Sequence, residues 1–226
     1  MSPRKRGKFI TFEGLDGCGK STQMERLVKV LQQQEGLEVM TTREPGGTAI
    51  GDRIRSVVLD SRTRGLAPLA ELALMFASRA QQIQENIVPA LDRGVWVLCD
   101  RFTDSSEAYQ GAGRGLGSES VLTLHRVLCG NLQPDLTILM DSDVSASVNR
   151  ARRRNQQQKG SVSQGDENRF ETESRAFFTR VHEKYLEIAA REPNRVAIID
   201  ARPAADITHT RIVQAVRQRL LEPVLD

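Results

Sequence analysis

The sequence predicts a three-layer α/β fold, in which a five-stranded parallel sheet carries helices on both faces. Three observations support this prediction. Short runs of β-branched and apolar residues alternate along the chain with segments whose apolar residues recur at the helical period. Each intervening segment is long enough for the right-handed helical crossover that joins parallel strands. The length of 226 residues is suited to one compact domain with a substantial core.

The first strand is expected at residues 8–13, which read KFITFE. A helix follows from Lys20, because apolar residues within 24–31 recur at i, i+3, i+4 and i+7, and Gly36 ends it. The other strands are expected at residues 37–42, 95–99, 136–140 and 196–199. The other helices are expected at residues 50–59, 68–91, 118–128, 144–154 and 168–191.

The charge balance gives little support to a polyanionic partner. The chain has 32 basic and 29 acidic residues, a net charge of +3, which is compatible with small phosphorylated ligands. Residues 1–7 are basic and lack a following apolar segment, so they are interpreted as a solvated tail and not as a secretory signal. We therefore expect no stable nucleic-acid partner.

Membrane and disulfide classes are also disfavoured. No apolar stretch approaches the ~20 residues that a bilayer-spanning helix needs, so we expect a soluble protein without a membrane partner. The three cysteines, Cys18, Cys99 and Cys129, are widely spaced and form no CxxC pair. This spacing favours neither a disulfide framework nor a zinc site, and a reducing cytoplasm is expected.

Residues 14–21 read GLDGCGKS and match the phosphate-binding pattern G-x-x-x-x-G-K-[ST], placed between a strand and a helix as that motif requires. Glycines let backbone N–H groups point at phosphate oxygens, while the following helix presents its positive end. This context predicts the P-loop NTPase form of the three-layer fold. Lys20 supplies charge toward the outer phosphates, and the Ser21 hydroxyl can bind Mg²⁺. The residues expected to bind ATP here are Gly14, Leu15, Asp16, Gly17, Cys18, Gly19, Lys20, Ser21 and Thr22.

Nucleotide binding alone leaves three classes open: a hydrolytic switch, a motor or nucleic-acid ATPase, and a small-molecule kinase. The chain has no N-K-x-D element, which disfavours a guanine-specific switch. The strand at 95–99 is followed by Asp100 and Arg101, so a cation stands where a hydrolase usually places a second acid. A cation there suits a second phosphate group and favours a kinase.

Four segments together identify a resemblance. They are EGLDG at 13–17, TREPGGT at 42–48, Asp100-Arg101, and AYQG at 108–111. In this order, each at a strand end, they resemble the thymidylate kinase family, and the match extends over residues 9–201. The resemblance implies transfer of the ATP γ-phosphoryl group to dTMP, giving dTDP and ADP, with Mg²⁺. It also implies a single nucleoside monophosphate kinase domain over residues 1–226, acting as a homodimer.

For the acceptor phosphate, the resemblance implies that Arg55 and Arg101 grip dTMP. Asp16 would accept a hydrogen bond from the sugar 3′-hydroxyl, and Asp100 would lie near the magnesium beside Ser21. The attacking phosphate oxygen is already anionic, so positioned cations lower the barrier without a general base. The residues assigned to catalysis are Asp16, Lys20, Arg101, Arg152 and Arg154.

Base recognition is expected on the 68–91 helix. Phe76 and Arg79 lie three apart on one face, where a ring can stack on thymine and a guanidinium can donate to a carbonyl. Family members usually place the aromatic four positions before the arginine, which here is Met75, so both Phe76 and Met75 are candidates.

The remaining substrate contacts follow from the same resemblance. Ser106 and Gln110 match the positions assigned to the pyrimidine edge, and Tyr109 would lie beneath the deoxyribose and exclude a 2′-hydroxyl. Glu44 of the TREPGGT segment is also assigned to the substrate site.

A mobile lid is expected over residues 150–170. Arg150, Arg152 and Arg154 fit the R-A-R-x-R pattern that opens the lid in relatives, although composition alone fits a solvated helix face equally. Some relatives carry an arginine in the P-loop where this chain has Gly17, so the lid would supply the transition-state cation. Arg150 and Ala201 complete the expected ATP contacts. Two alternatives remain: a kinase for another nucleoside monophosphate, and a P-loop ATPase that binds nucleic acid.

Overall fold

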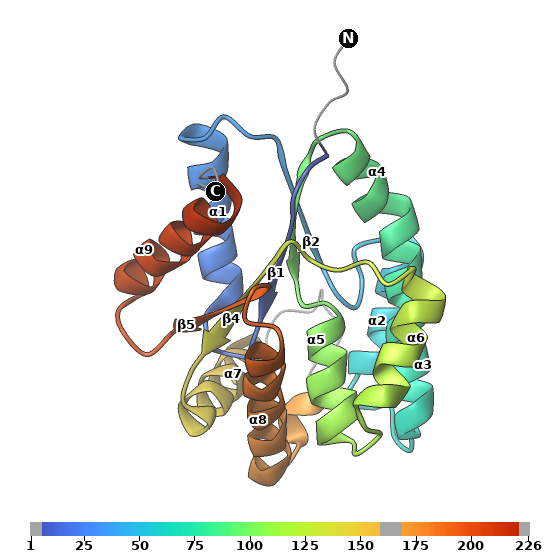
Figure 1. Ribbon diagram of the computed structural model, residues 1–226. Helices are drawn as coiled ribbons and strands as arrows, with labels where there is room; N and C mark the ends of the chain where they lie inside the picture. Colours follow the sequence, from blue (N-terminus) through green and yellow to red (C-terminus); the bar gives the residue numbers. More distant parts are fainter. Residues whose placement is uncertain (1–5, 159–168, 222–226) are drawn as a thin grey trace.

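The computed structural model describes residues 6–158 and 169–221 and contains one five-stranded, wholly parallel sheet (Figure 1). Its strand order is β2-β3-β1-β4-β5. The predicted sheet is confirmed, with boundaries that differ by one or two residues. The strands are β1 (Phe9–Glu13), β2 (Val39–Arg43), β3 (Trp96–Asp100), β4 (Leu136–Asp141) and β5 (Val196–Asp200).

β1 lies at the centre of the sheet, paired with β3 on one side and β4 on the other. All of its residues are buried, as expected for a parallel strand covered on both faces. The register places Asp100 beside both Phe12 of β1 and Arg43 of β2. The carboxyl ends of β1, β2 and β3 therefore meet at one edge, where open α/β sheets bind ligands.

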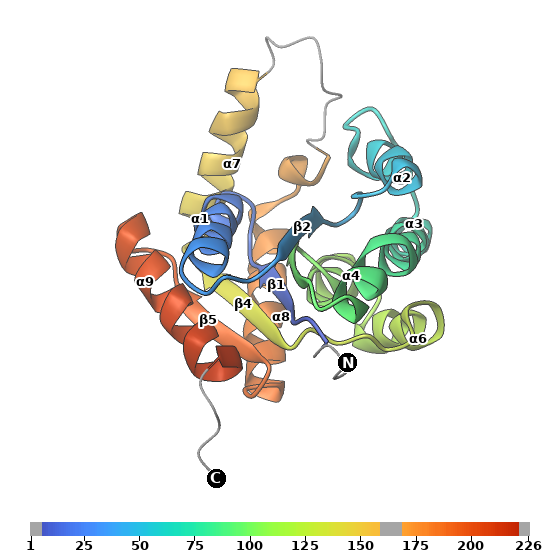
Figure 2. The ribbon, with the colours of Figure 1, turned by 90° about the horizontal axis from the view of Figure 1, so that it is seen from above.

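The helices cover both faces (Figure 2). α1 and α9 pack against one face, and α3, α4, α6 and α8 lie on the other with the short α5. The helical elements are α1 (Lys20–Gln33), α2 (Ala49–Leu59), α3 (Pro68–Gln82), η1 (Ile83–Ile87), α4 (Val88–Asp92), α5 (Thr103–Ser106), η2 (Glu107–Gly113), α6 (Ser118–Cys129), α7 (Val144–Gln158), η3 (Phe170–Thr172), α8 (Arg175–Arg191), α9 (Ala205–Val216) and η4 (Arg217–Leu221).

Two expected helices have a different form. The helix expected at 68–91 is three consecutive elements, because a wider π-turn precedes Pro89, which has no N–H to donate to the preceding turn. The helix expected from 168 begins instead at Arg175, since the Ser174 hydroxyl accepts from Phe177 N at 3.2 Å and caps it there. α5, η2 and α9 are additions that the apolar periodicity did not indicate.

Residues 1–5 of the expected basic tail and 159–168 of the expected lid lie outside the described residues. Within the described parts of the chain, no helix combines the length and apolar character needed to cross a membrane.

Candidate active site

The phosphate loop connects β1 to α1 and depends on glycine for its shape. Gly17 has a φ of 80°, and a Cβ atom at this position would lie 2.4 Å from the Ser147 carbonyl oxygen and 2.9 Å from Ala151 N. Gly14, with a φ of 128°, approaches the Met140 carbonyl in the same way. The loop backbone is thus in close contact with both α7 and the end of β4.

Lys20 occupies the interior of this loop. Its ammonium donates to the carbonyl oxygens of Gly14 at 3.1 Å and Leu15 at 3.0 Å, and lies 3.9 Å from Asp16 Oδ1. The side chain is buried, so its charge is concentrated within the loop. This placement suits electrostatic stabilisation of a phosphate group bound above the loop.

Ser21 and Asp100 form the candidate metal site. The Ser21 hydroxyl donates to Asp100 Oδ2 at 3.1 Å, while Asp100 Oδ1 is buried and has no hydrogen-bond partner among the described residues. Magnesium is usually held by one or two protein oxygens together with water and phosphate oxygens. The free carboxylate oxygen and the adjacent hydroxyl fit that donor set. In residues 6–158 and 169–221 no cluster of three or more His, Cys, Asp or Glu offers an all-protein metal cage.

Asp16 and Arg101 form an ion pair beside the loop. Arg101 Nη2 donates to Asp16 Oδ1 at 2.7 Å and its Nη1 donates to Tyr185 OH at 3.1 Å. Its guanidinium carbon lies 5.0 Å from the centre of the Tyr109 ring. Burial alone would raise the pKa of Asp16, but Arg101 and Lys20 outweigh it and hold that pKa well below its usual range. Asp16 is consequently an ionised acceptor across the neutral pH range.

A pocket of about 400 Å³ opens over these groups. Its lining joins the phosphate loop to the ends of β2 and β3 and to α7, and cations outnumber carboxylates in it. The lining residues are Asp16, Gly17, Gly19, Lys20, Ser21, Thr22, Arg43, Glu44, Arg55, Asp100, Arg101, Arg150 and Arg154. A surplus of positive charge around a concave site favours phosphate anions.

Arg43 was missed by the sequence reasoning although it belongs to the TREPGGT segment. It lies at the end of β2 and approaches Asp52 at 3.7 Å. Arg55, which was expected, reaches the pocket from α2 and donates to the Pro45 carbonyl at 2.9 Å. Only the pairing of β2 with β3 brings Arg43 beside the phosphate loop.

A buried polar cluster extends from the pocket under α3. Arg79 Nε donates to Glu44 Oε2 at 2.5 Å, and Arg79 Nη2 donates to Ser106 Oγ at 2.9 Å. The third nitrogen, Nη1, is buried without a partner among the described residues, as are Glu44 Oε1 and Gln110 Oε1. Buried polar atoms are normally satisfied, so three such atoms in one region make it a candidate place for a ligand.

The two candidates for contact with the base face different surroundings. Phe76 has no exposed surface and packs with Phe9 and Leu72, while the Arg79 guanidinium carbon lies 4.5 Å from its ring centre. Met75 belongs instead to the apolar cluster that contains Tyr109. Phe76 therefore offers no ring face to a ligand in this structure, because core side chains and Arg79 cover it.

Tyr109 lies on η2 with only 5% of its surface exposed. Its ring makes an edge contact with Phe170 at 5.6 Å, and its hydroxyl accepts from Arg101 Nη2 at 3.3 Å. The ring is thus fixed on both sides, next to the group expected to bind the acceptor phosphate.

The arginines of α7 separate into two groups. Arg150 donates to the Gly17 carbonyl at 2.8 Å, and both Arg150 and Arg154 line the pocket. Arg152 donates instead to the carbonyl oxygens of Glu171 at 3.0 Å and Glu173 at 3.1 Å, outside the pocket. Residues four apart on a helix share a face, whereas a residue two positions away points to another side, which the R-A-R-x-R pattern did not reveal.

Ala201 lies directly after β5, where its N–H donates to the Asp141 carbonyl at 2.7 Å. It is not among the residues that line the pocket. It lies at a strand end on the same edge of the parallel sheet as the phosphate loop.

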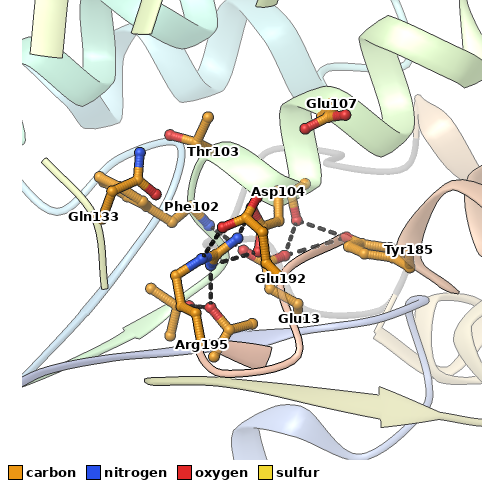
Figure 3. A network of polar contacts seen from close by, with 12 residues as sticks. Glu13, Phe102, Thr103, Asp104, Glu107, Gln133, Tyr185, Glu192 and Arg195 are labelled. Atoms are coloured by element: carbon orange, nitrogen blue, oxygen red, sulfur yellow. Dashed lines mark hydrogen bonds and ion pairs between the residues drawn. The ribbon is translucent and has the colours of Figure 1, made fainter. Parts of the chain in front are cut away.

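A second buried polar network contains Glu13, the last residue of β1, directly before the phosphate loop (Figure 3). Glu13 accepts from Phe102 N at 2.7 Å and from Ser105 Oγ at 2.5 Å, and Tyr185 OH lies 3.2 Å away. Burial, reinforced by the charge of Asp104, raises the pKa of Glu13 to about 7. The sequence reasoning used Glu13 only as part of a motif and assigned it no contact.

The strand–loop–helix phosphate site, the parallel sheet and the second basic subsite define a P-loop phosphotransferase. Comparison with known proteins narrows this class. The thymidylate kinase family model matches residues 12–212, and the chain belongs to that family.

Individual relatives agree over nearly the full chain. The thymidylate kinase of Trichlorobacter lovleyi is 49% identical over 216 residues, covering 96% of this chain and 100% of the relative. That of Pelobacter propionicus is 46% identical, covering 95% and 96%. A crystal structure of thymidylate kinase from Ehrlichia chaffeensis superposes with a TM-score of 0.72 at 29% identity, covering 93% of this chain and 99% of that one.

Proposed function

We propose that this protein transfers the γ-phosphoryl group of ATP to dTMP, giving dTDP and ADP. The protein is an enzyme of the thymidylate kinase family, and its family membership favours dTMP over the other nucleoside monophosphates. The observation that carries the proposal is that Glu44, which lines the basic pocket, is paired with Arg79, and that Arg79 and Gln110 hold buried polar atoms without a partner among the described residues. The basic pocket suits phosphates, and the unpaired donor of Arg79 with the unpaired acceptor of Gln110 suits the polar edge of a base.

ATP binds through its phosphates to the backbone N–H groups of residues 14–22 and to Lys20. Ser21 and Asp100 would hold Mg²⁺, which neutralises phosphate charge when it is bound. The adenine lies toward Ala201, across the end of β4 from the loop.

The dTMP phosphate binds Arg55 and Arg101, with Arg43 added to this group because it lines the same pocket. Asp16, kept ionised by its neighbours, accepts from the 3′-hydroxyl. Since the attacking oxygen is already anionic, the site acts by alignment and by charge stabilisation, and it does not need a proton acceptor.

For the base, Arg79 Nη1 donates to a thymine carbonyl and Gln110 Oε1 accepts from the ring N–H. Met75, and not Phe76, lies against the ring, because Phe76 is enclosed in the core. Tyr109 occupies the space in which a 2′-hydroxyl would project.

Arg150 and Arg154 of α7 supply cations to the transferring group. Arg152 holds the turn at 170–173 to α7.

The enzyme acts in the cytoplasm as a homodimer. Exposed apolar side chains gather on α2, α3 and α6, which are neighbouring helices, and they suit an interface with a second copy. These side chains are Ile50, Val57, Leu69, Val127 and Leu128.

The reaction is tested by measuring ADP release with each nucleoside monophosphate in turn, with Lys20→Ala as an inactive control. We expect the highest kcat/KM with dTMP. Faster turnover of another monophosphate would reassign the substrate. Loss of ATP that depends on DNA alone would favour the nucleic-acid ATPase.

A further inference from the structure

Glu71 is a carboxylate without exposed surface on α3, next to the candidate base site. It accepts from Gln110 Nε2 at 2.8 Å, from Arg114 Nε at 3.2 Å and from Arg169 Nη1 at 2.7 Å. A buried carboxylate is costly unless it is paired and hydrogen-bonded, and here all three partners are donors. Glu71 does not line the basic pocket.

The contact with Gln110 fixes the direction of that amide. The Arg114 and Arg169 guanidinium groups have only donors, so the Glu71 oxygens facing them can only accept. Gln110 must therefore turn its NH₂ toward Glu71 and its Oε1 away. Oε1 is buried and has no partner in the described parts of the chain.

Arg79 supplies the complementary atom. Its Nε is bound to Glu44 and its Nη2 to Ser106, which leaves Nη1 as a buried donor without a partner. Ser106 and Gln110 are four residues apart in the consecutive elements α5 and η2, and thus on adjacent turns. Arg79, which is bound to Ser106, and Gln110 thus hold an unpaired donor and an unpaired acceptor at neighbouring positions.

This pair matches one pyrimidine edge and opposes the other. Thymine presents an O4 acceptor beside an N3–H donor, whereas cytosine presents an amino donor beside an N3 acceptor. If the Gln110 amide were reversed, its NH₂ would meet the thymine N3–H and would instead suit N3 of cytosine, while Arg79 would still oppose the cytosine amino group. The orientation of the amide thus determines the part of the discrimination that is made at N3.

We propose that Glu71 is a positioning residue for base selection: it holds the Gln110 amide so that Oε1 faces the base, and thereby selects thymine over cytosine. This inference rests on the proposed function, which places the pyrimidine between Arg79 and Gln110.

The test is Glu71→Gln, with kcat/KM measured for dTMP and dCMP. A glutamine at 71 can donate to Gln110 Oε1 and so permits the reversed amide. We expect the dTMP/dCMP ratio to fall at least about tenfold, because a site built for a hydrogen bond discriminates strongly only while its polar groups are fixed. The KM for ATP should change less than about twofold, because the ATP site is separate.

A double-mutant cycle with Gln110→Ala distinguishes an effect of Glu71 on the orientation of Gln110 from an effect on the stability of the whole protein. If Glu71 acts through Gln110, Glu71→Gln lowers the ratio in the wild-type background and has no further effect in the Gln110→Ala background. A merely structural role would lower Tm in both backgrounds and leave the ratio unchanged.

Arg114→Met is the matched control. It removes a different partner of Glu71 and leaves the bond between Glu71 and Gln110 in place. We expect a lower Tm with a dTMP/dCMP ratio within about threefold of wild type, since the amide remains oriented.

If Glu71→Gln does not fold, the exchange variant Glu71→Gln/Gln110→Glu keeps one carboxylate in the network and again presents an acceptor to the base. Its ratio should stay within about threefold of wild type, because the acceptor is retained. Loss of the dTMP preference in the folded exchange variant, or its full retention in folded Glu71→Gln, overturns the inference. Absence of any dTMP preference in the wild type would instead contradict the proposed function.

Discussion

At the scale of single residues, the site depends on side chains that buried neighbours hold in one orientation. Tyr109 is one example, because Phe170 and Arg101 hold its ring on two sides. A ring held in one place excludes a 2′-hydroxyl by steric conflict, whereas a flexible side chain could move aside.

Tyr109→Ala should therefore narrow the difference in kcat/KM between dTMP and its ribonucleotide counterpart, because the space for a 2′-hydroxyl opens. Steady-state kinetics with both nucleotides provide the measurement. Tyr109→Phe, which keeps the ring and loses only the hydrogen bond from Arg101 Nη2, should retain the discrimination. Equal discrimination in all three proteins would remove Tyr109 from the sugar site.

The arginines of α7 give a second prediction at this scale. Arg154→Ala should lower kcat by ~10²-fold, since a cation aimed at the transferring group acts mainly in the transition state. Arg152→Ala should have a smaller effect on kcat, because Arg152 binds carbonyls outside the pocket. The KM for dTMP should change little in either variant, and Arg153→Ala serves as the matched control. An unchanged phosphoryl-transfer step in single-turnover experiments with Arg154→Ala would place Arg154 on a solvated helix face.

At the scale of secondary-structure elements, Glu13 connects the end of β1 with α5 and α8 through Phe102, Ser105 and Tyr185. Its pKa is raised from 4.5 to about 7 by burial and by Asp104, although Arg101 opposes the change. Between these values the unfolded chain has lost the proton that the folded protein still holds. The free energy of unfolding therefore falls as the pH rises from about 4.5 to about 7.

Glu13→Gln should remove this pH-dependent contribution to the free energy of unfolding. Each unit of pKa corresponds to about 1.4 kcal/mol, so the wild type should lose on the order of 3 kcal/mol more than the variant across this range. Urea unfolding at pH 5 and pH 8 measures the difference, with Glu25→Gln on the exposed side of α1 as a control. Parallel pH dependence in wild type and Glu13→Gln would contradict a raised pKa at this position.

At the scale of the whole molecule, the exposed apolar side chains on α2, α3 and α6 bear on assembly. Val127 is 73% exposed and Leu69 is 62% exposed, which is unusual for large apolar residues on adjacent helices. Val127→Lys should shift the protein from dimer to monomer, because a charge would be buried at the interface. Light scattering after size exclusion measures the mass. Ile207→Lys, on α9 at the opposite face of the sheet, should leave the dimer intact, and a wild-type monomer would refute the proposal.

The sheet and its phosphate loop could be predicted from sequence because each signal is local. β1 and β3 read as short buried runs, and residues 14–21 carry their chemistry in consecutive positions. α5 and η2 could not be found in this way, because their buried side chains are mainly polar and bind Glu13, Arg79 and Glu71. The positions of Arg43 and Glu71 likewise depend on strand pairing and helix packing, which no short pattern records. Phe76 shows the opposite case: its spacing from Arg79 on α3 suggested a ring that stacks on the base, whereas its side chain has no exposed surface.

The contact between Gly17 and α7 limits the evolutionary routes open to this enzyme. An arginine in place of Gly17 would need room for a side chain where the Ser147 carbonyl oxygen lies 2.4 Å from the would-be Cβ. Here such a mutation would be harmful until α7 moved away, and that movement would withdraw Arg150 and Arg154 from the pocket. Intermediate sequences would then have neither source of charge. A change from arginines on α7 to an arginine in the loop would therefore require several mutations whose effects depend strongly on one another. The close approach of the loop backbone to α7 thus makes the present arrangement hard to replace.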